Sequence, residues 1–129
     1  MTEKIEILNM HNTPVTPDLC IRIDRMTKWG NPYKMQRESD RLDVIQKYTY
    51  YILDSKLLNN LHELESKWLC CWCYPKPCHG NVLKYLCEHP EVVKMYKKCE
   101  ISRDGIVNLI WKDNGWKHEI KGKQMTLNV

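Results

Sequence analysis

The sequence of 129 residues contains no phenylalanine, so its five tryptophans and seven tyrosines supply the aromatic bulk. Both side chains carry a polar edge that needs a partner when it is buried. No apolar run approaches the roughly 18 residues that span a bilayer. The opening residues MTEKIEILNM also lack the apolar core of a secretory signal. We therefore expect a cytoplasmic protein with no membrane partner.

A strong excess of one charge is also absent. The net charge is +4, from 20 lysines and arginines against 16 aspartates and glutamates, and the basic residues are dispersed among the acids. Proteins that bind nucleic acids usually concentrate lysine and arginine in one patch. The composition is compatible with a phosphate-bearing small ligand and does not require non-specific DNA binding.

Patterns of apolar residues predict one α/β or α+β domain over residues 1–129. Alternating or fully apolar runs indicate strands, and spacings of three and four indicate helices. Strands are expected at 4–10, 19–24 and 67–72, and helices at 39–56, 57–66, 79–89 and 90–100. The strand at 67–72 is apolar on both faces, which predicts a place at the centre of the sheet. A turn and a helix follow it, so the turn lies where open α/β sheets bind ligands.

The segment 101–129 predicts a C-terminal β-hairpin that extends the same domain. Asp113-Asn114-Gly115 is a turn signal between two runs of alternating apolar residues. The exposed edge of such a hairpin can pair with a second copy of the chain. A homo-oligomer formed through this hairpin is therefore one expectation.

Four of the seven cysteines lie in LCCWCYPKPCHG, residues 69–80. In a reducing cytosol, clustered cysteines indicate metal binding, catalysis or burial before disulfides. If Cys71 and Cys73 both lie on the strand, their side chains share a face. Two prolines then steer the chain to a helix that starts near Cys78 and His79. Three thiolates and one imidazole form a legitimate zinc set, so these four residues are candidate zinc ligands. Their spacing is unusual, because zinc ligands more often form two separated pairs.

Three other interpretations of this stretch remain open. Cys78 is a candidate nucleophile because a helix start lowers a thiol pKa, with a base such as His11 supplied from elsewhere in the chain. The turn before His79, Gly80 and Asn81 is a candidate anion site that presents backbone N–H groups. Core packing is the third interpretation, and it is favoured for Cys20, Cys70, Cys87 and Cys99.

A second group of candidates surrounds WGNP, residues 29–32. Gly30 permits a tight turn. Beside it, Trp29 suits stacking on a planar ring and Asn31 suits hydrogen bonding to the edge of a heterocycle. Arg25 and Arg41 suit phosphate recognition, since a guanidinium pairs with phosphate through two hydrogen bonds. Together these residues are typical of a nucleotide pocket, although a rigid corner packed by Trp29 and a solvated Arg41 explain the same pattern.

These stretches resemble the family called domain of unknown function 4326. The resemblance rests on Ile23-Asp24-Arg25, WGNPY at 29–33, Arg41 and LCCWCYPKPCHGNVLKYL at 69–86. It covers about residues 19–87, and CWCYPKPCHG is its most specific part. Members are short proteins of bacteria, bacteriophages and large DNA viruses. This chain departs from the family pattern with Asp24 in place of glycine and Asn81 in place of aspartate.

The resemblance implies a compact, Rossmann-like α/β domain whose shared polar residues converge on one pocket. It carries over Arg25, Trp29, Asn31, Arg41, Cys71, Cys73, Cys78 and His79. We expect a cytoplasmic domain, in the host cytoplasm if the chain is viral, that binds a nucleotide or nucleoside-like ligand. It would also process that ligand if Cys78 and His79 carry catalysis. The alternative is a non-catalytic module, stabilised by zinc, that binds a nucleic acid or a host protein.

Overall fold

A small parallel sheet forms one side of the molecule. The computed structural model describes residues 6–10, 20–65, 67–73 and 75–117. The strands are β1 (Ile7–Asn9), β2 (Cys20–Arg22) and β3 (Trp68–Cys71), in the order β1-β3-β2. Leu69 of β3 pairs with Ile7 on one side and Ile21 on the other. The central position predicted for this strand is confirmed, and its apolar residues Leu69 to Cys71 are at most 1% exposed.

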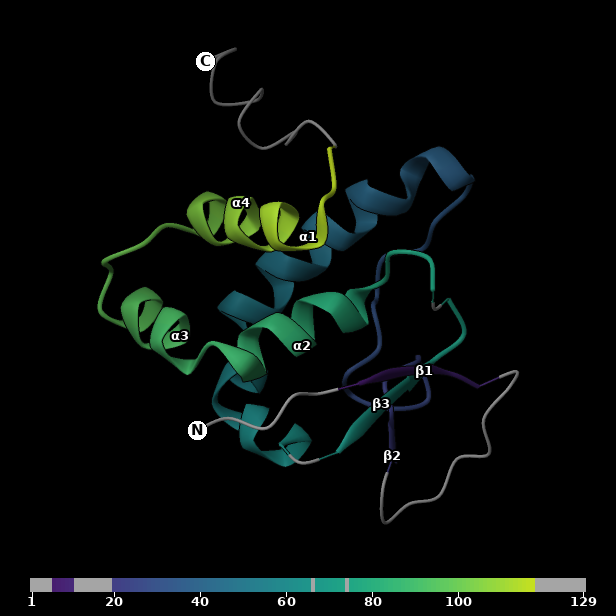
Figure 1. Ribbon diagram of the computed structural model, residues 1–129, viewed down its shortest axis with the longest axis horizontal. Helices are drawn as coiled ribbons and strands as arrows, with labels where there is room; N and C mark the ends of the chain where they lie inside the picture. The colour runs from purple at the N-terminus through teal and green to yellow at the C-terminus, as the bar shows by residue number, and fades with distance from the viewer. Residues whose placement is uncertain (1–5, 11–19, 66, 74, 118–129) are drawn as a thin grey trace.

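Helices cover the sheet and form most of the described chain. They are the 3₁₀ helix η1 (Glu38–Asp40), α1 (Arg41–Asp54), the 3₁₀ helix η2 (Lys56–Leu64), α2 (His79–Glu88), α3 (Pro90–Lys97) and α4 (Arg103–Asn114). Helix α2 contacts β1 and β3, and it also contacts α1 and α4 (Figure 1). It therefore lies between the sheet and these two helices. A mixed α/β fold is confirmed, whereas a Rossmann-like three-layer arrangement is not.

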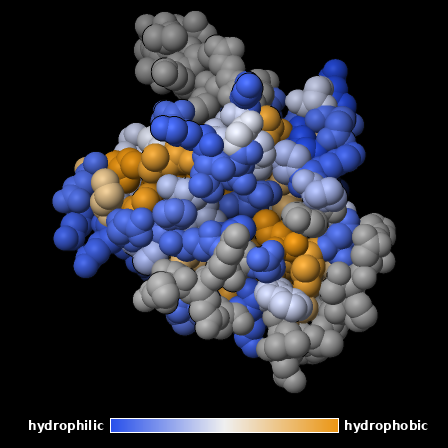
Figure 2. Space-filling model, in the orientation of Figure 1, coloured by the Kyte–Doolittle hydropathy of each residue, from blue (hydrophilic) through white to orange (hydrophobic). Residues whose placement is uncertain are grey.

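The core lies between α1, α2 and α4, and between α2 and the sheet. Ile45, Tyr48 and Ile52 recur along one face of α1 at spacings of three and four, and each is at most 1% exposed. Leu83 of α2 and Ile110 of α4 are fully buried against this group. Figure 2 shows a largely hydrophilic face, with hydrophobic surface between α3 and α4 and again near the sheet. None of the helices in the described ranges is long and apolar enough to span a membrane.

The predicted C-terminal hairpin is wrong over residues 103–114, which form α4. Ile106, Val107, Ile110 and Trp111 are buried, and their spacing is that of one helical face. Ser102 begins the helix by accepting a hydrogen bond from the Gly105 amide at 3.0 Å. The first strand of the predicted hairpin is therefore not available to form the edge of an oligomer.

The turn signal that suggested the hairpin is the end of this helix. Gly115 has a left-handed backbone with φ of 72°, and the Trp116 amide donates to the Trp111 carbonyl at 2.9 Å. A glycine in this conformation is a common helix terminator, because it has no Cβ to clash. The same Asn-Gly dipeptide is favoured in tight hairpins, so the local sequence does not separate the two outcomes. The rest of the predicted hairpin, residues 118–129, lies outside the described residues.

Candidate functional site

A cavity of about 340 Å³ lies at the carboxyl ends of β2 and β3. Its wall is built from the segments that follow these strands and from the starts of α1 and α2. The residues that line it are Asp24, Arg25, Met26, Asn31, Tyr33, Met35, Arg41, Val44, Ile45, Cys71, Trp72, Cys73, Pro77, Cys78 and His79. Parallel strands end at the same edge of a sheet, so the segments after β2 and β3 meet here.

The structure brings most of the predicted site residues to this cavity. Those at its wall are Arg25, Asn31, Arg41, Cys71, Cys73, Cys78 and His79. In the described part of the chain, the wall does not include Trp29, Gly30, Gly80 or Asn81. His11, considered as a distant base, lies outside the described residues. The two sequence stretches singled out above thus converge on one place, and they divide there into wall residues and supporting residues.

Trp29 belongs to the supporting group. Its side chain is 3% exposed and packs in the hydrophobic core. The Tyr48 hydroxyl from α1 donates to the Trp29 carbonyl at 2.8 Å, which fixes the backbone of the corner. The structure thus favours the rigid-corner interpretation of Trp29, since a ring this deeply buried presents no face to a ligand.

Gly30 supports the same corner through close backbone packing. A Cβ placed on it would lie 2.6 Å from both the Arg25 Cα and the Asp24 carbonyl oxygen. Only glycine fits such an approach, because the neighbouring atoms are backbone and cannot move aside. Gly80 is similarly enclosed, with a Cβ position 2.8 Å from a methyl group of Ile23.

Asn81 caps the helix that begins at the cavity. Its Oδ1 accepts from the Cys78 amide at 3.0 Å, and the Cys78 thiol accepts from the Gly80 amide at 3.3 Å. These reciprocal bonds form a capping box for α2. The side-chain Nδ2 of Asn81 also donates to Asn114 Oδ1 at 3.1 Å, which ties the start of α2 to the end of α4.

Arg25 carries a positive charge at the cavity, and its side chain bonds to backbone carbonyls. Its Nε donates to the Asn31 carbonyl at 2.9 Å, and Nη2 donates to the Tyr33 carbonyl at 3.4 Å. Within the described ranges, no carboxylate lies at ion-pair distance from Arg25. Its positive charge also contributes to a lowered pKa of His79, after the larger effect of burial.

Asn31 is used inside the fold. Its Nδ2 donates to the Val44 carbonyl at 3.2 Å, and its Oδ1 accepts from the Tyr33 amide at 2.9 Å. Both ends of the side-chain amide are thus occupied, and the residue is 9% exposed. It holds the segment after Gly30 against α1. The side chain thus supports the wall of the cavity and does not offer its amide to the edge of a heterocycle.

Arg41 differs from Arg25 because its charge has an acidic partner. Its guanidinium pairs with the Glu38 carboxylate, and Nη1 donates to the Pro77 carbonyl at 3.0 Å. The hydrogen bond that Arg41 donates to Glu38 raises the pKa of Arg41, and the same contact lowers the pKa of Glu38 to about 2. The Cys73 thiol also lies against this guanidinium. Arg41 thus clamps the proline-rich turn to the start of α1.

Two buried thiols form part of the wall. The sulfur atoms of Cys71 and Cys78 are 3.4 Å apart, and the two residues are 1% and 3% exposed. The contact with Cys71, together with burial, raises the pKa of Cys78 well above its ordinary value, although the Gly80 amide opposes the shift. A thiol with a raised pKa stays protonated and is a weak nucleophile. The raised pKa therefore argues against activation of Cys78 by the helix start.

His79 is held as a neutral ring. Its Nε2 donates to the Ile23 carbonyl, and its ring packs edge-on against Tyr48 with centroids 4.9 Å apart. Burial lowers the pKa of His79, although the bond to Ile23 opposes the shift. Within residues 6–10, 20–65, 67–73 and 75–117, no group of three or more His, Cys, Asp or Glu side chains is arranged to hold a metal ion. Zinc at Cys71, Cys73, Cys78 and His79 stays a prediction.

The cysteines expected in the core divide in two. Cys20, Cys70 and Cys87 are buried, and burial raises the pKa of Cys70 and of Cys87 to about 12. Cys99 is exposed at the end of α3, where its backbone has φ of 61°, so the prediction of a core position is wrong for it. The helix ends just before Cys99, and this turns its side chain away from the core.

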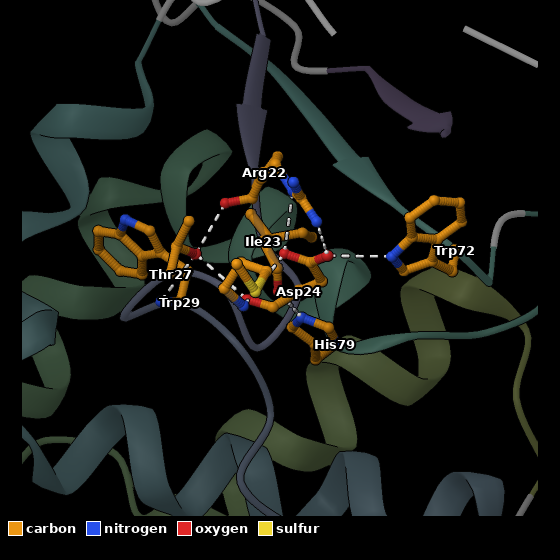
Figure 3. Close-up of polar contacts among 8 residues, drawn as sticks. Arg22, Ile23, Asp24, Thr27, Trp29, Trp72 and His79 are labelled. Atoms are coloured by element: carbon orange, nitrogen blue, oxygen red, sulfur yellow. Dashed lines mark hydrogen bonds and ion pairs between the residues drawn. The ribbon is translucent and has the colours of Figure 1, made fainter. Parts of the chain in front are cut away.

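Asp24, which departs from the family pattern and was not among the predicted site residues, is a central residue of the site. It pairs with Arg22, whose Nη2 lies 2.6 Å from Oδ2 (Figure 3). No ion pair among the described residues joins it to the adjacent Arg25. The indole Nε1 of Trp72 donates to the same oxygen, Oδ2, at 2.9 Å, and the Met26 amide donates to Oδ1 at 3.3 Å. Burial alone raises the pKa of Asp24, but these hydrogen bonds outweigh it and lower the pKa.

The residues at the rim of the cavity were not among the predicted site residues. Four large side chains there are well exposed: Met26 at 75%, Trp72 at 47%, Tyr33 at 40% and Met35 at 38%. Three of them come from the irregular segment 25–38. A long irregular segment in a compact domain is often functional, and its apolar residues were the signal available.

The sequence model of a family described as Domain of unknown function (DUF4326) matches residues 8–89 of this chain. The chain belongs to this family. Every residue that lines the cavity falls inside the matched range, whereas α3 and α4 follow it. The cavity is therefore part of the DUF4326 region.

A curated relative of this DUF4326 chain comes from a giant virus. "Uncharacterized protein R718" of Acanthamoeba polyphaga mimivirus is 31% identical over 74 residues. The alignment covers 57% of this chain and 56% of the relative, so the chain spans little more than half the length of that protein. The match supports a viral association. No solved structure matches the chain.

Proposed function

We propose that this cavity binds a nucleotide or nucleoside-like ligand, with the anionic group of the ligand at Arg25 and its planar ring at the apolar rim. The observation that carries the proposal is the guanidinium of Arg25. Its hydrogen bonds go to neutral carbonyls, and no described carboxylate pairs with it. A cation held at a cavity wall with its charge uncompensated favours an anionic ligand.

The size and lining of the cavity support the same class of ligand. Small-molecule sites usually enclose about 300–1,000 Å³, and 340 Å³ lies at the small end of that range. This favours a nucleoside or mononucleotide over a dinucleotide. The exposed aromatic and thioether side chains of the rim suit a planar apolar ring. The place of the cavity, at the carboxyl ends of parallel strands, is where open α/β sheets bind ligands.

The proposal assigns binding and not turnover. Cys78 and His79 were candidate catalytic residues, but the raised pKa of Cys78 disfavours its thiolate and His79 donates Nε2–H to a backbone carbonyl. Neither arrangement produces a nucleophile. The proposal instead assigns both side chains a place in the wall of the cavity, shielded from water. Burial contributes to both pKa shifts, which supports this role.

The zinc-stabilised module remains the competing hypothesis, with a nucleic acid or a host protein as its partner. Elemental analysis of protein purified without added metal separates the two. About one zinc per chain would favour the module, in which Cys71, Cys73, Cys78 and His79 rearrange around the ion. Zinc-free protein that unfolds cooperatively would remove it.

Replacement of Arg25 tests the proposed function. Wild-type protein and the Arg25→Ala, Arg25→Lys and Arg37→Ala variants are heated with and without adenosine 5′-monophosphate (AMP), uridine 5′-monophosphate (UMP) or ribose 5-phosphate. A ligand that binds only the folded state raises Tm. We expect the shift to disappear in Arg25→Ala, to persist in part in Arg25→Lys, and to be unchanged in Arg37→Ala, whose side chain is exposed outside the cavity. An undiminished shift in Arg25→Ala would refute the proposal.

A further inference from the structure

Trp72 follows β3 directly and lies at the wall of the cavity. Its side chain is 47% exposed, so a large part of the indole is accessible to solvent. The indole is nevertheless anchored along one edge, because Nε1 donates to Asp24 Oδ2 at 2.9 Å. An exposed ring that is fixed at one edge loses little conformational entropy when a ligand covers it.

Asp24 is itself immobilised, which makes the anchor rigid. Arg22 donates to both carboxylate oxygens, from Nε at 3.3 Å and from Nη2 at 2.6 Å, and the Met26 amide donates at 3.3 Å. The Thr27 hydroxyl closes the same turn by donating to the Arg22 carbonyl at 2.8 Å. Figure 3 shows the carboxylate of Asp24 between the Arg22 guanidinium and the Trp72 indole. The orientation of the indole is thus set by the turn that follows β2.

The other tryptophans in the described chain do not offer such a surface to the cavity. Trp29 is in the core, Trp111 and Trp116 pack edge-on against each other with centroids 4.9 Å apart, and Trp68 stands at the opposite end of β3. The turn that anchors Trp72 also carries Arg25, the residue after Asp24. One turn therefore presents a cation and orients a flat aromatic wall of the same cavity.

We propose that Trp72 is the surface on which the planar ring of the ligand stacks, and that Asp24 is the residue that positions it. This inference rests on the proposed function, because it assumes an anion at Arg25, and it narrows the ligand class to anions that carry an aromatic ring. Stacking of a base on an aromatic side chain is tolerant of base identity. Purine and pyrimidine nucleotides should therefore both bind, and sugar phosphates that lack a base should bind more weakly.

The test compares AMP and UMP with ribose 5-phosphate by calorimetric titration. In the wild type we expect both nucleotides to bind at least about tenfold more tightly than the sugar phosphate. Trp72→Ala should weaken nucleotide binding by about 5-fold to 100-fold, and should leave ribose 5-phosphate within about twofold. The matched control is Trp68→Ala, which removes an indole of nearly equal exposure from the other end of β3 and should change neither affinity.

A spectroscopic readout separates positioning by Asp24 from a general structural role. Nucleotide should quench the tryptophan fluorescence of the wild type and of Trp68→Phe, and should not quench that of Trp72→Phe. Asp24→Gly removes the acceptor for the indole and should weaken both the quenching and nucleotide affinity by several-fold. Asp24→Asn keeps an acceptor oxygen and should restore both.

The outcomes distinguish this inference from the function on which it rests. If ribose 5-phosphate binds as tightly as AMP, needs Arg25, and is indifferent to Trp72, the stacking proposal fails while anion binding at Arg25 stands. If none of the three probes binds the wild type, both proposals fail. A loss of nucleotide affinity in Trp68→Ala equal to that in Trp72→Ala would also overturn the stacking proposal.

Discussion

The two ends of β3 carry the same residue in nearly the same state of exposure. Trp68 opens the strand and is 45% exposed, and Trp72 follows its last residue and is 47% exposed. Trp68 lies outside the cavity in the described structure, whereas Trp72 lines it and donates to Asp24. Residue type and exposure therefore do not separate a binding surface from an ordinary surface.

Strand direction makes the difference between the two ends. Because β2 and β3 run parallel, the segments that leave them emerge at the same edge of the sheet. These segments contribute Asp24, Arg25 and the proline-rich turn, and the cavity forms between them. At the amino end, Cys20 of β2 pairs with Trp68 of β3. Topology thus concentrates polar and aromatic groups at one end.

Gly30→Ala, which fills a close contact beside the cavity, should lower the free energy of unfolding more than the other changes. The new methyl group of Gly30→Ala meets backbone atoms of Asp24 and Arg25 at 2.6 Å, so the corner must shift. We expect a loss of about 3 kcal/mol in the free energy of unfolding, measured by urea denaturation. Gly115→Ala is the control, since its Cβ would meet nothing and only the positive φ costs about 1 kcal/mol. Equal losses would show that the corner is loosely packed.

Removing the Tyr48 hydroxyl should produce the next largest effect. Tyr48→Phe leaves the buried Trp29 carbonyl without its donor at 2.8 Å, which should cost about 1–2 kcal/mol in urea denaturation. Tyr51→Phe is the comparison, because the described residues give the Tyr51 hydroxyl no hydrogen-bond partner. A smaller loss for Tyr48→Phe than for Tyr51→Phe would contradict the role of Tyr48 in holding the corner.

The stability of the protein should also depend on pH through His79, which lies at the carboxyl end of β3 beside the cavity. Burial lowers the pKa of His79 below 6.5, its ordinary value, so the unfolded chain binds a proton before the folded protein does. Stability should therefore fall as the pH drops from about 6.5 toward the lower pKa of the folded state. Above about pH 6.5 this group should not change the stability. Urea titrations between about pH 8 and pH 5 measure the slope. His79→Gln should reduce it, and His62→Gln, at an exposed position of η2, should preserve it.

The smallest expected effect is the difference in stability between the two tryptophan variants. Trp72→Phe loses the hydrogen bond to Asp24 and should cost about 0.5–1 kcal/mol, since the pair is partly exposed. Trp68→Phe should stay within about 0.5 kcal/mol of the wild type. Identical unfolding curves for the two variants would indicate that the indole is not anchored, and the contrast between the strand ends would weaken.

Much of the fold follows from local sequence signals. Apolar periodicity predicted the strands, α1, α2 and α3, and the continuous apolar run at 67–72 predicted the central strand. The failure at α4 has a local cause as well. Asp113-Asn114-Gly115 fits both a hairpin and a helix end, and the choice depends on burial of Ile106 and Ile110 against other helices.

The candidate site was less predictable, and the tryptophans show why. WGNP suggested Trp29 as the stacking residue because it stands beside a fixed turn. Whether that indole faces a ligand or the core depends on α1, where Tyr48 binds its backbone. The partner of Trp72 is Asp24, 48 positions away in the sequence. Neither fact is contained in a local pattern.

The sequence by itself determined the turns and helix ends near the cavity. Glycine at position 30 leaves room for the backbone of Asp24 and Arg25, which lie six and five residues before it. The prolines of 73–78 and the capping residues of α2 act through backbone preferences within a few residues, which the local sequence contains.

Tertiary structure alone decided which side chains face the cavity and which charges are neutralised. The bond from His79 to Ile23 spans 56 positions and that from Arg41 to Pro77 spans 36. Burial and pairing are properties of segments that meet only after the sheet has formed. Trp29 and Trp72 therefore acquire opposite roles although the same residue type occupies both positions.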